Sequence, residues 1–286
     1  MAWPDKRFDT VDDLFKHLLD MWKKDKLVAC RGQADSRWPL QTSLDRILDP
    51  NADYAARLAE ESALLEKFRV LAREYVGSLE AQYLYGGRKN EKISALAVLQ
   101  HYRAPTRLLD WTHSPWVALY FAAIDHHDKP GAVWWFDQVS FKNKVHRRWK
   151  EYDMEQYRGP GPNDQINLNA TAFNTDGPSW ITGLYYPVPF HRIEVQQGLF
   201  TVAGRLGVEH SELIADVFDR RDTSGGMAQT ENQYARIIVP ASLKQKVLKR
   251  LHTMNIHSRS LDYPGADIVG VDLTLNLRNK QGQRCS

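Results

Sequence analysis

The sequence predicts an α+β fold with a mixed or antiparallel central sheet and a helical N-terminal half. At 286 residues, with 43% hydrophobic and 26% charged residues, the chain is long enough to bury a large core. Helical spacing dominates its first half, and short apolar segments between turn residues dominate its second half. No internal repeat is visible, which argues against solenoids and propellers. We therefore expect one domain.

The boundaries of the elements follow from apolar spacing and from helix start and stop signals. Helices are predicted over 10–24, 52–75, 92–102 and 114–123, with Thr10 and Ser114 as caps and Pro105 beyond the end of the third helix. Strands are expected at 26–30, 107–111, 131–137 and 236–239, with paired strands over 191–203 that turn near Gln196, Gln197 and Gly198. A last helix is expected over 243–254. The predicted organisation is an N-terminal helix in 1–25, a single domain over 26–278 with long loops near 152–190 and 222–230, and a disordered tail at 279–286.

Composition and charge narrow the functional class. The net charge of +3 permits contact with nucleic acid without arguing for it, and two cysteines are too few for a disulfide framework. No apolar segment approaches the roughly 18 residues of a membrane span, and the polar N-terminus lacks the apolar segment of a signal peptide. We expect a cytoplasmic protein with no membrane partner.

Two polar segments are the candidate site. Arg31, Gly32 and Gln33 follow a short apolar strand, and an arginine beside a glycine there suits a phosphate or a carboxylate, although a surface ion pair is about as common. The segment from Leu99 to Ser114 is richer, because it gathers many hydrogen-bonding groups around an apolar strand: Gln100, His101, Tyr102, Thr106, Arg107, Asp110, Trp111, Thr112, His113 and Ser114. These groups either face a ligand or form one satisfied polar network. Arg107 and Asp110 could instead be structural, paired with each other or with neighbouring residues. His101 is either a general acid or base or a structural histidine.

Other chemistries have weaker support. His126 and His127 are adjacent and lack ligand partners at metal-binding spacing, so no metal site is predicted. Nucleotide-binding glycine loops and hydrolase elbows are absent. The run from Phe141 to Lys150 interleaves basic and aromatic residues, which is typical of a solvated helix face and, less often, of a surface for single-stranded nucleic acid.

Together these residues resemble the FRG domain family, which is named for an aromatic-Arg-Gly motif. The motif stands here as Cys30-Arg31-Gly32-Gln33, with cysteine in the aromatic position, and the most specific block is Gln100-His101-Tyr102 followed by 105–112 (PTRLLDWT). Further blocks are Arg192 with 196–201 (QQGLFT), and a fainter one between Ile256 and Asp267. The resemblance is expected to span about residues 26–270.

The resemblance implies a site and, by the order of elements, the split sheet of the ADP-ribosyltransferase fold. On that fold NAD is the substrate and a protein or nucleic acid is the acceptor, as in toxins and phage-defence effectors. The implied contacts to NAD come from Arg31, Gly32, Gln33, Thr106, Arg107, Asp110, Trp111, Thr112 and Ser114, with His101 near the ribose and with Arg192 and Gln197 toward the acceptor.

One element of that pattern is missing. Transferases of this fold usually carry a glutamate on a late strand, whereas the strand at 236–239 begins with Arg236. Either Glu231, Glu194 or Asp267 replaces it, or the chain lacks an acid that activates the nucleophile. The expected function is mono-ADP-ribosyl transfer. An NAD glycohydrolase and a non-catalytic nucleotide or nucleic-acid binding module are the alternatives.

Overall fold

The computed structural model describes residues 3–22, 27–74, 76–85, 91–151, 172–174, 179–184, 190–219 and 233–261. Within these ranges seven strands form one mixed sheet in the order β1-β7-β4-β2-β3-β6-β5. Only the β1–β7 pair is parallel, and the other pairs are antiparallel. The strands are β1 (Asp5–Arg7), β2 (Val28–Gln33), β3 (Leu108–Thr112), β4 (Gly131–Asp137), β5 (Ile181–Leu184), β6 (Gly198–Ala203) and β7 (Tyr234–Val239). The predicted α+β class is confirmed, and the strands expected at 26–30, 107–111, 131–137 and 236–239 are present as β2, β3, β4 and β7. The strand β1 was not predicted, and β5 lies within the segment that was expected to be a long loop.

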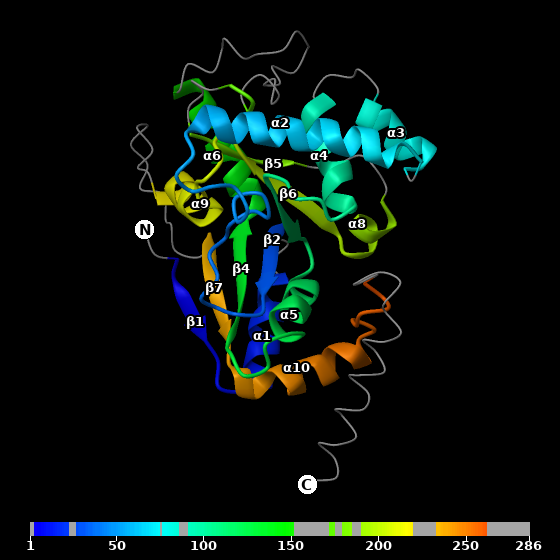
Figure 1. Cartoon of the computed structure of the whole chain (residues 1–286). Helices are drawn as coiled ribbons and strands as arrows, with labels where there is room; N and C mark the ends of the chain where they lie inside the picture. The colour runs from blue at the N-terminus through cyan, green and yellow to red at the C-terminus, as the bar shows by residue number, and fades with distance from the viewer. Residues whose placement is uncertain are drawn as a thin grey trace.

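Helices cover both faces of the sheet and one of its ends (Figure 1). The helices are α1 (Val11–Trp22), α2 (Tyr54–Leu71) with the short 3₁₀ helix η1 (Ala72–Glu74), α3 (Ser78–Tyr85), α4 (Glu91–His101), α5 (Pro115–Ala123), α6 (Gln138–Glu151), α8 (His191–Val195), α9 (His210–Asp219) and α10 (Ala241–Thr253). Apolar residues of α1, α5 and α10 pack on one face of β2, β4 and β7, and residues of α6 and α9 pack on the other. Residues of α2, α3 and α4 form a third cluster against β3 and β6. None of the described helices is long and apolar enough to cross a bilayer.

Local sequence signals explain the best-predicted elements. Ser114 caps α5 by accepting a hydrogen bond from the backbone N–H of Val117, and Pro115 begins the helix. Asp53 caps α2 in the same way through Ala56. Both helices therefore begin close to where the sequence predicts them.

The paired strands predicted over 191–203 are wrong in their first half. Residues His191–Val195 form the short helix α8, and only Gly198–Ala203 forms a strand. Gln197 has a φ of 49°, a left-handed conformation that ends the helix and turns the chain into β6. A segment this short carries too few apolar positions for periodicity to separate a helix from a strand.

Candidate functional site

The sheet opens between its two central strands, β2 and β3. These strands are paired at a single position, Cys30 with Thr112. By contrast, β2 pairs with β4 through six residues, and β3 pairs with β6 through five. Beyond Cys30 the two strands separate, and Arg31 lies at the point of separation. A sheet that parts in this way leaves space for a ligand between its two halves.

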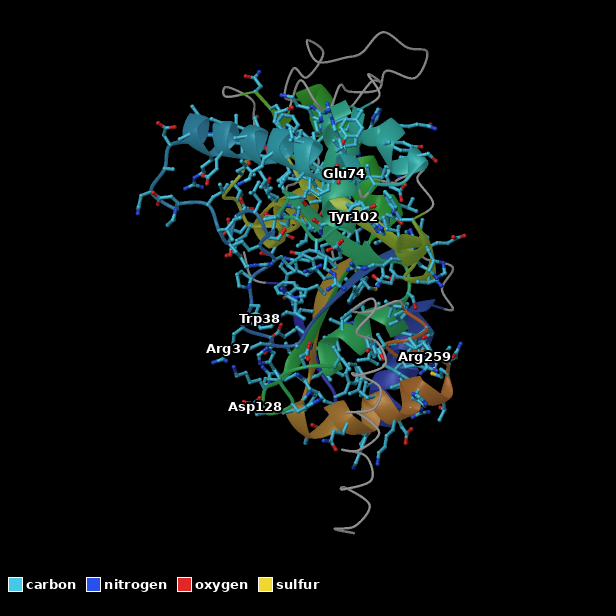
Figure 2. The ribbon with its side chains drawn as sticks, turned by 45° about the vertical axis from the view of Figure 1, so that its right-hand side comes forward. Arg37, Trp38, Glu74, Tyr102, Asp128 and Arg259 are labelled. Atoms are coloured by element: carbon cyan, nitrogen blue, oxygen red, sulfur yellow. The ribbon has the colours of Figure 1, made fainter. Side chains whose placement is uncertain are left out.

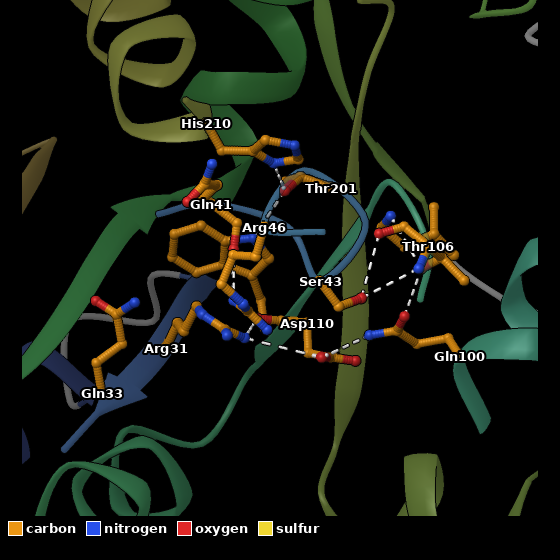
Figure 3. A network of polar contacts seen from close by, with 12 residues as sticks. Arg31, Gln33, Gln41, Ser43, Arg46, Gln100, Thr106, Asp110, Thr201 and His210 are labelled. Atoms are coloured by element: carbon orange, nitrogen blue, oxygen red, sulfur yellow. Dashed lines mark hydrogen bonds and ion pairs between the residues drawn. The ribbon is translucent and has the colours of Figure 1, made fainter. Parts of the chain in front are cut away.

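Arg31 reaches across this opening to the third strand. Its Nη1 donates a hydrogen bond to the backbone carbonyl of Asp110 at 2.8 Å and lies 3.8 Å from the carboxylate Oδ2. That carboxylate oxygen also accepts a hydrogen bond from Gln100 Nε2 at 2.8 Å, and Thr106 donates to the other end of the Gln100 amide. Figure 3 shows this chain of contacts between β2, β3 and the end of α4. The structure thus brings Arg31 together with residues 100–110.

Two adjoining pockets flank Arg31. The first has a volume of about 210 Å³ and lies on the β3 side, where its lining includes Asp110, Thr112, Arg192 and Gln196. The second, of about 470 Å³, lies beyond the end of β2, and its lining includes Gln33, Trp38, Arg46 and Asp125. Both pockets are lined by Arg31, Gly32 and Phe121. Arg31 therefore stands where one elongated ligand would cross from the first pocket to the second.

The guanidinium groups of the cleft are only partly engaged by contacts within the described residues. Arg31 Nε is buried and has no hydrogen-bond partner among the described residues. Burial lowers the pKa of the Arg31 guanidinium, Asp110 acts to raise it, and the nearby charge of Arg46 acts to lower it further. Arg192 lines the first pocket and forms no ion pair within the described part of the chain. Arg31, Arg46 and Arg192 together, with one unused buried N–H on Arg31, suit an anion such as a phosphate group.

Gly32 and Gln33 serve the architecture as well as the cleft. A Cβ on Gly32 would lie 1.9 Å from the backbone oxygen of Ala118, so only glycine lets α5 pack this closely on β2. The Gln33 amide donates to the carbonyl of Pro39 at 3.0 Å and accepts from the indole N–H of Trp134 at 2.7 Å. Both ends of this amide are occupied, which makes Gln33 a wall residue of the second pocket.

Two predicted site residues lie outside the cleft. Arg107 is 1% exposed, forms a two-pronged ion pair with Glu61, and donates to the carbonyl of Ala172 at 2.6 Å. Thr106 is fully buried, and its hydroxyl is engaged with Gln100. Neither residue lines either pocket, so the expected NAD contacts from Thr106 and Arg107 are replaced by structural contacts. Arg107 and Asp110 do not pair with each other, and the structure instead confirms the alternative of pairing with other residues. Arg107 pairs with Glu61, and the Asp110 carboxylate lies 3.8 Å from Arg31.

The end of β3 contributes mainly fixed backbone and buried side chains. Trp111 is 3% exposed, donates its indole N–H to Thr201 at 2.9 Å, and packs edge-on against Phe136, which leaves little of its ring for stacking on a ligand. Thr112 lines the first pocket, but its hydroxyl donates to the carbonyl of Gln196 at 2.6 Å. Ser114 is occupied as the cap of α5. These residues shape the pocket and hold its two sides together.

The remaining predicted residues are distributed around the cleft. His101 stacks on Phe190 with ring centroids 4.3 Å apart, outside the residues that line the two pockets. Gln197 is exposed and contributes its carbonyl to the N–H of His113. Arg192 lines the first pocket. Glu231 and Asp267 lie outside the described residues.

Sequence reasoning missed three members of the cleft. Trp38 is 43% exposed and lies near the surface with Arg37 and Asp128 (Figure 2). Arg46 donates to the carbonyl of Gln41 at 3.1 Å, and Phe121 belongs to α5 between the two pockets. An exposed tryptophan shortly after a polar strand end was the available signal for Trp38. No sequence spacing indicated Arg46 or Phe121.

Metal-ligating side chains do not cluster within the described residues. No group of three or more histidine, cysteine, aspartate or glutamate side chains is arranged around a common point within the described residues. The groups that line the two pockets are instead guanidinium groups, the exposed carboxylates of Asp110 and Asp125, and aromatic rings.

Comparison with known proteins gives one result. Residues 26–130 match the family model of the FRG domain. No curated protein and no solved structure matches the chain. The matched segment runs from just before β2 to just before β4, and so includes Arg31 and the whole 100–114 segment, whereas the blocks near 192–201 and 256–267 lie beyond it. Residues 26–130 thus match an FRG domain, and this segment includes both strands that flank the cleft, β2 and β3.

Proposed function

We propose that the cleft between β2 and β3 binds NAD and that the protein is a mono-ADP-ribosyltransferase acting on a protein or nucleic-acid acceptor. The observation that carries this proposal is the position of Arg31. It stands between two adjoining pockets and keeps a buried guanidinium N–H without a partner. A dinucleotide has two planar ends joined by a pyrophosphate, which is the shape that two pockets with a cation between them would accept.

Two parts of the ligand have groups to receive them. Arg31 would bind the pyrophosphate, with Arg192 or Arg46 as the second cation on either side. Trp38 offers an exposed ring at the second pocket for one of the planar ends. The toxin or phage-defence setting that the family resemblance implied is part of the same proposal.

Asp110 is the carboxylate that we assign to the reaction. It is the acidic residue lining the first pocket, its side chain is 52% exposed, and Gln100 and Arg31 hold it in place. In the transfer, the bond between the nicotinamide nitrogen and the ribose C1′ breaks, and its electron pair stays with nicotinamide. The acceptor nucleophile then forms the new bond to C1′ and loses its proton. A carboxylate fixed beside the ribose would stabilise the positive charge that develops on it.

The proximity of Arg31 to Asp110 favours a second candidate function, a non-catalytic binding module. The guanidinium of Arg31 is 3.8 Å from Asp110, and a carboxylate neutralised by an arginine is a weaker stabiliser of an oxocarbenium ion. Under this alternative the cleft binds a dinucleotide without turnover. An NAD glycohydrolase would use the same pockets and pass the ribose to water.

A nicotinamide-release assay separates these functions. The purified chain is incubated with labelled NAD, with and without cell lysate, as wild type and as Arg31→Ala, Asp110→Asn, Glu231→Ala and Asp267→Ala variants. Arg7→Ala is the matched control, because the Arg7 side chain is 73% exposed and remote from both pockets. We expect label on a macromolecule, and loss of turnover in Arg31→Ala and Asp110→Asn only.

The alternatives give different results in the same assay. Nicotinamide release without a labelled macromolecule would assign the glycohydrolase. NAD binding that is lost in Arg31→Ala, with no nicotinamide released under any condition, would assign the binding module. If NAD neither binds nor reacts, the proposal is wrong.

A further inference from the structure

A third cavity lies beneath α6. It has a volume of about 410 Å³, within the roughly 300–1,000 Å³ range of small-molecule sites. Its walls come from α6 and from strands β4, β5 and β6, and they include Phe136, Phe141, Trp149 and Leu199. None of its lining residues belongs to the two pockets beside Arg31. The cavity is therefore separate from the proposed NAD cleft.

The side chain of Gln138 is the unexplained feature of this cavity. Gln138 is the first residue of α6, is 3% exposed, and lines the cavity. Both its Nε2 and its Oε1 are buried, and neither has a hydrogen-bond partner among the described residues. A buried amide with no partner at either end is costly, and native structures rarely keep one without a ligand or water to satisfy it.

The surroundings of the cavity are held in place by other contacts. Arg148 Nη1 pairs with Asp216 Oδ2 at 2.7 Å and so fixes α6 to α9. Lys144 donates to the carbonyl of Phe218 at 3.2 Å. Phe141 packs against Phe136 with ring centroids 4.8 Å apart. These contacts also use two of the cations in the 141–150 run, which weakens the idea that the run is a continuous surface for nucleic acid.

We propose that this cavity is a binding site for a nucleobase, recognised edge-on by Gln138. A carboxamide offers one donor and one acceptor side by side, and a base edge offers the complementary pair, as in the bidentate contact of glutamine with adenine. The aromatic rings of Phe136, Phe141 and Trp149 supply the apolar walls that a flat heterocycle needs. The exposed residues Lys142 and His146 line the same cavity from α6.

The ligand can reach the site as a free base or as the base of a mononucleotide, and the test distinguishes the two. Adenine and adenosine 5′-monophosphate are titrated into the full chain by isothermal calorimetry. Tighter binding of the mononucleotide that is lost in Lys142→Ala places its phosphate beside Lys142. Equal affinity for the two assigns the free base.

Three variants test the recognition itself. Gln138→Leu removes both hydrogen bonds and should weaken adenine binding at least tenfold, and Gln138→Met, an unbranched side chain of similar length, serves as the second variant should leucine impair folding. Val139→Ala is the matched control, because Val139 is the next residue of α6 and is 54% exposed. Naphthalene, a fused ring of similar size with neither a donor nor an acceptor, should bind the Gln138 variants at least as well as wild type.

The opposite outcomes are equally clear. Adenine binding that survives unchanged in folded Gln138→Leu or Gln138→Met would overturn the proposal. So would binding that is lost in Arg31→Ala and retained in the Gln138 variants, because it would belong to the cleft between β2 and β3. If neither adenine nor adenosine 5′-monophosphate binds at its solubility limit, the proposal is also overturned, whatever the result of the NAD assay.

Discussion

Replacing Glu61 by leucine should be among the most damaging single substitutions in this protein. Glu61 and Arg107 are each 1% exposed, so the variant leaves a guanidinium buried without its countercharge. Breaking a buried pair from one side costs about 3–5 kcal/mol, a large part of the roughly 5–15 kcal/mol by which a domain is stable. We expect the urea midpoint of Glu61→Leu to fall sharply, with the slope of the transition unchanged.

The double variant Glu61→Leu with Arg107→Met is the decisive control. It removes both charges, which is often neutral or stabilising, but it leaves the carbonyl of Ala172 without its 2.6 Å donor, at a cost of about 1–3 kcal/mol. The double variant should therefore lie within about 2 kcal/mol of wild type. A double variant no more stable than Glu61→Leu alone would refute the ion-pair reasoning. If the double variant folds but no longer binds ligand in the cleft, Arg107 would have to be assigned a role in ligand binding.

Three further predictions concern single groups. Gly32→Ala should destabilise the fold by about 1–3 kcal/mol or more in chemical denaturation, because its Cβ would meet the Ala118 oxygen at 1.9 Å, and an unchanged midpoint would contradict the close packing of α5 on β2. Burial, with a smaller contribution from the charge of Arg31, lowers the pKa of His210 to about 3, so the unfolded chain gains a proton near pH 6.5 that the folded chain refuses. Stability should then fall by up to about 1.4 kcal/mol per pH unit between pH 6.5 and pH 4, and His210→Gln should flatten that slope in melts across this range. Cys30 is fully buried and burial raises its thiol pKa, so it should react only slowly with a thiol reagent. Rapid labelling of Cys30 in native buffer, told apart from labelling of Cys285 by peptide mass, would contradict that placement.

Strong local signals made much of the fold predictable from the sequence. The start of α5 follows from Ser114 and Pro115, and β4 follows from its run of apolar residues. By contrast, β1 is a three-residue polar strand held beside β7, where Asp5 accepts from Arg236 at 2.7 Å. A contact over that sequence distance leaves no local pattern, which is why the strand was not predicted.

The candidate site was predictable only in part, for a similar reason. The sequence pointed to Arg31 and to the 100–114 segment, but the roles of individual residues depend on which side of a strand each one faces. Arg107 and Asp110 are three positions apart on the same segment, yet one is sealed against Glu61 and the other opens into the first pocket. No sequence pattern predicted a role for Gln138, because whether an amide lacks hydrogen-bond partners depends on its neighbours in the folded structure.

The single pairing between Cys30 and Thr112 means that the two halves of the sheet are joined chiefly through a helix. The helix α5 continues directly from β3, and it lies so close to β2 and β4 that only glycine is accommodated at Gly32 and Gly131. The width of the cleft is thus governed by helix packing, with few backbone bonds to resist a change in the angle between the halves. A ligand that contacts both sides of the cleft would restrict motion between the two halves of the sheet. Its binding should therefore slow amide hydrogen exchange along β3 and β6.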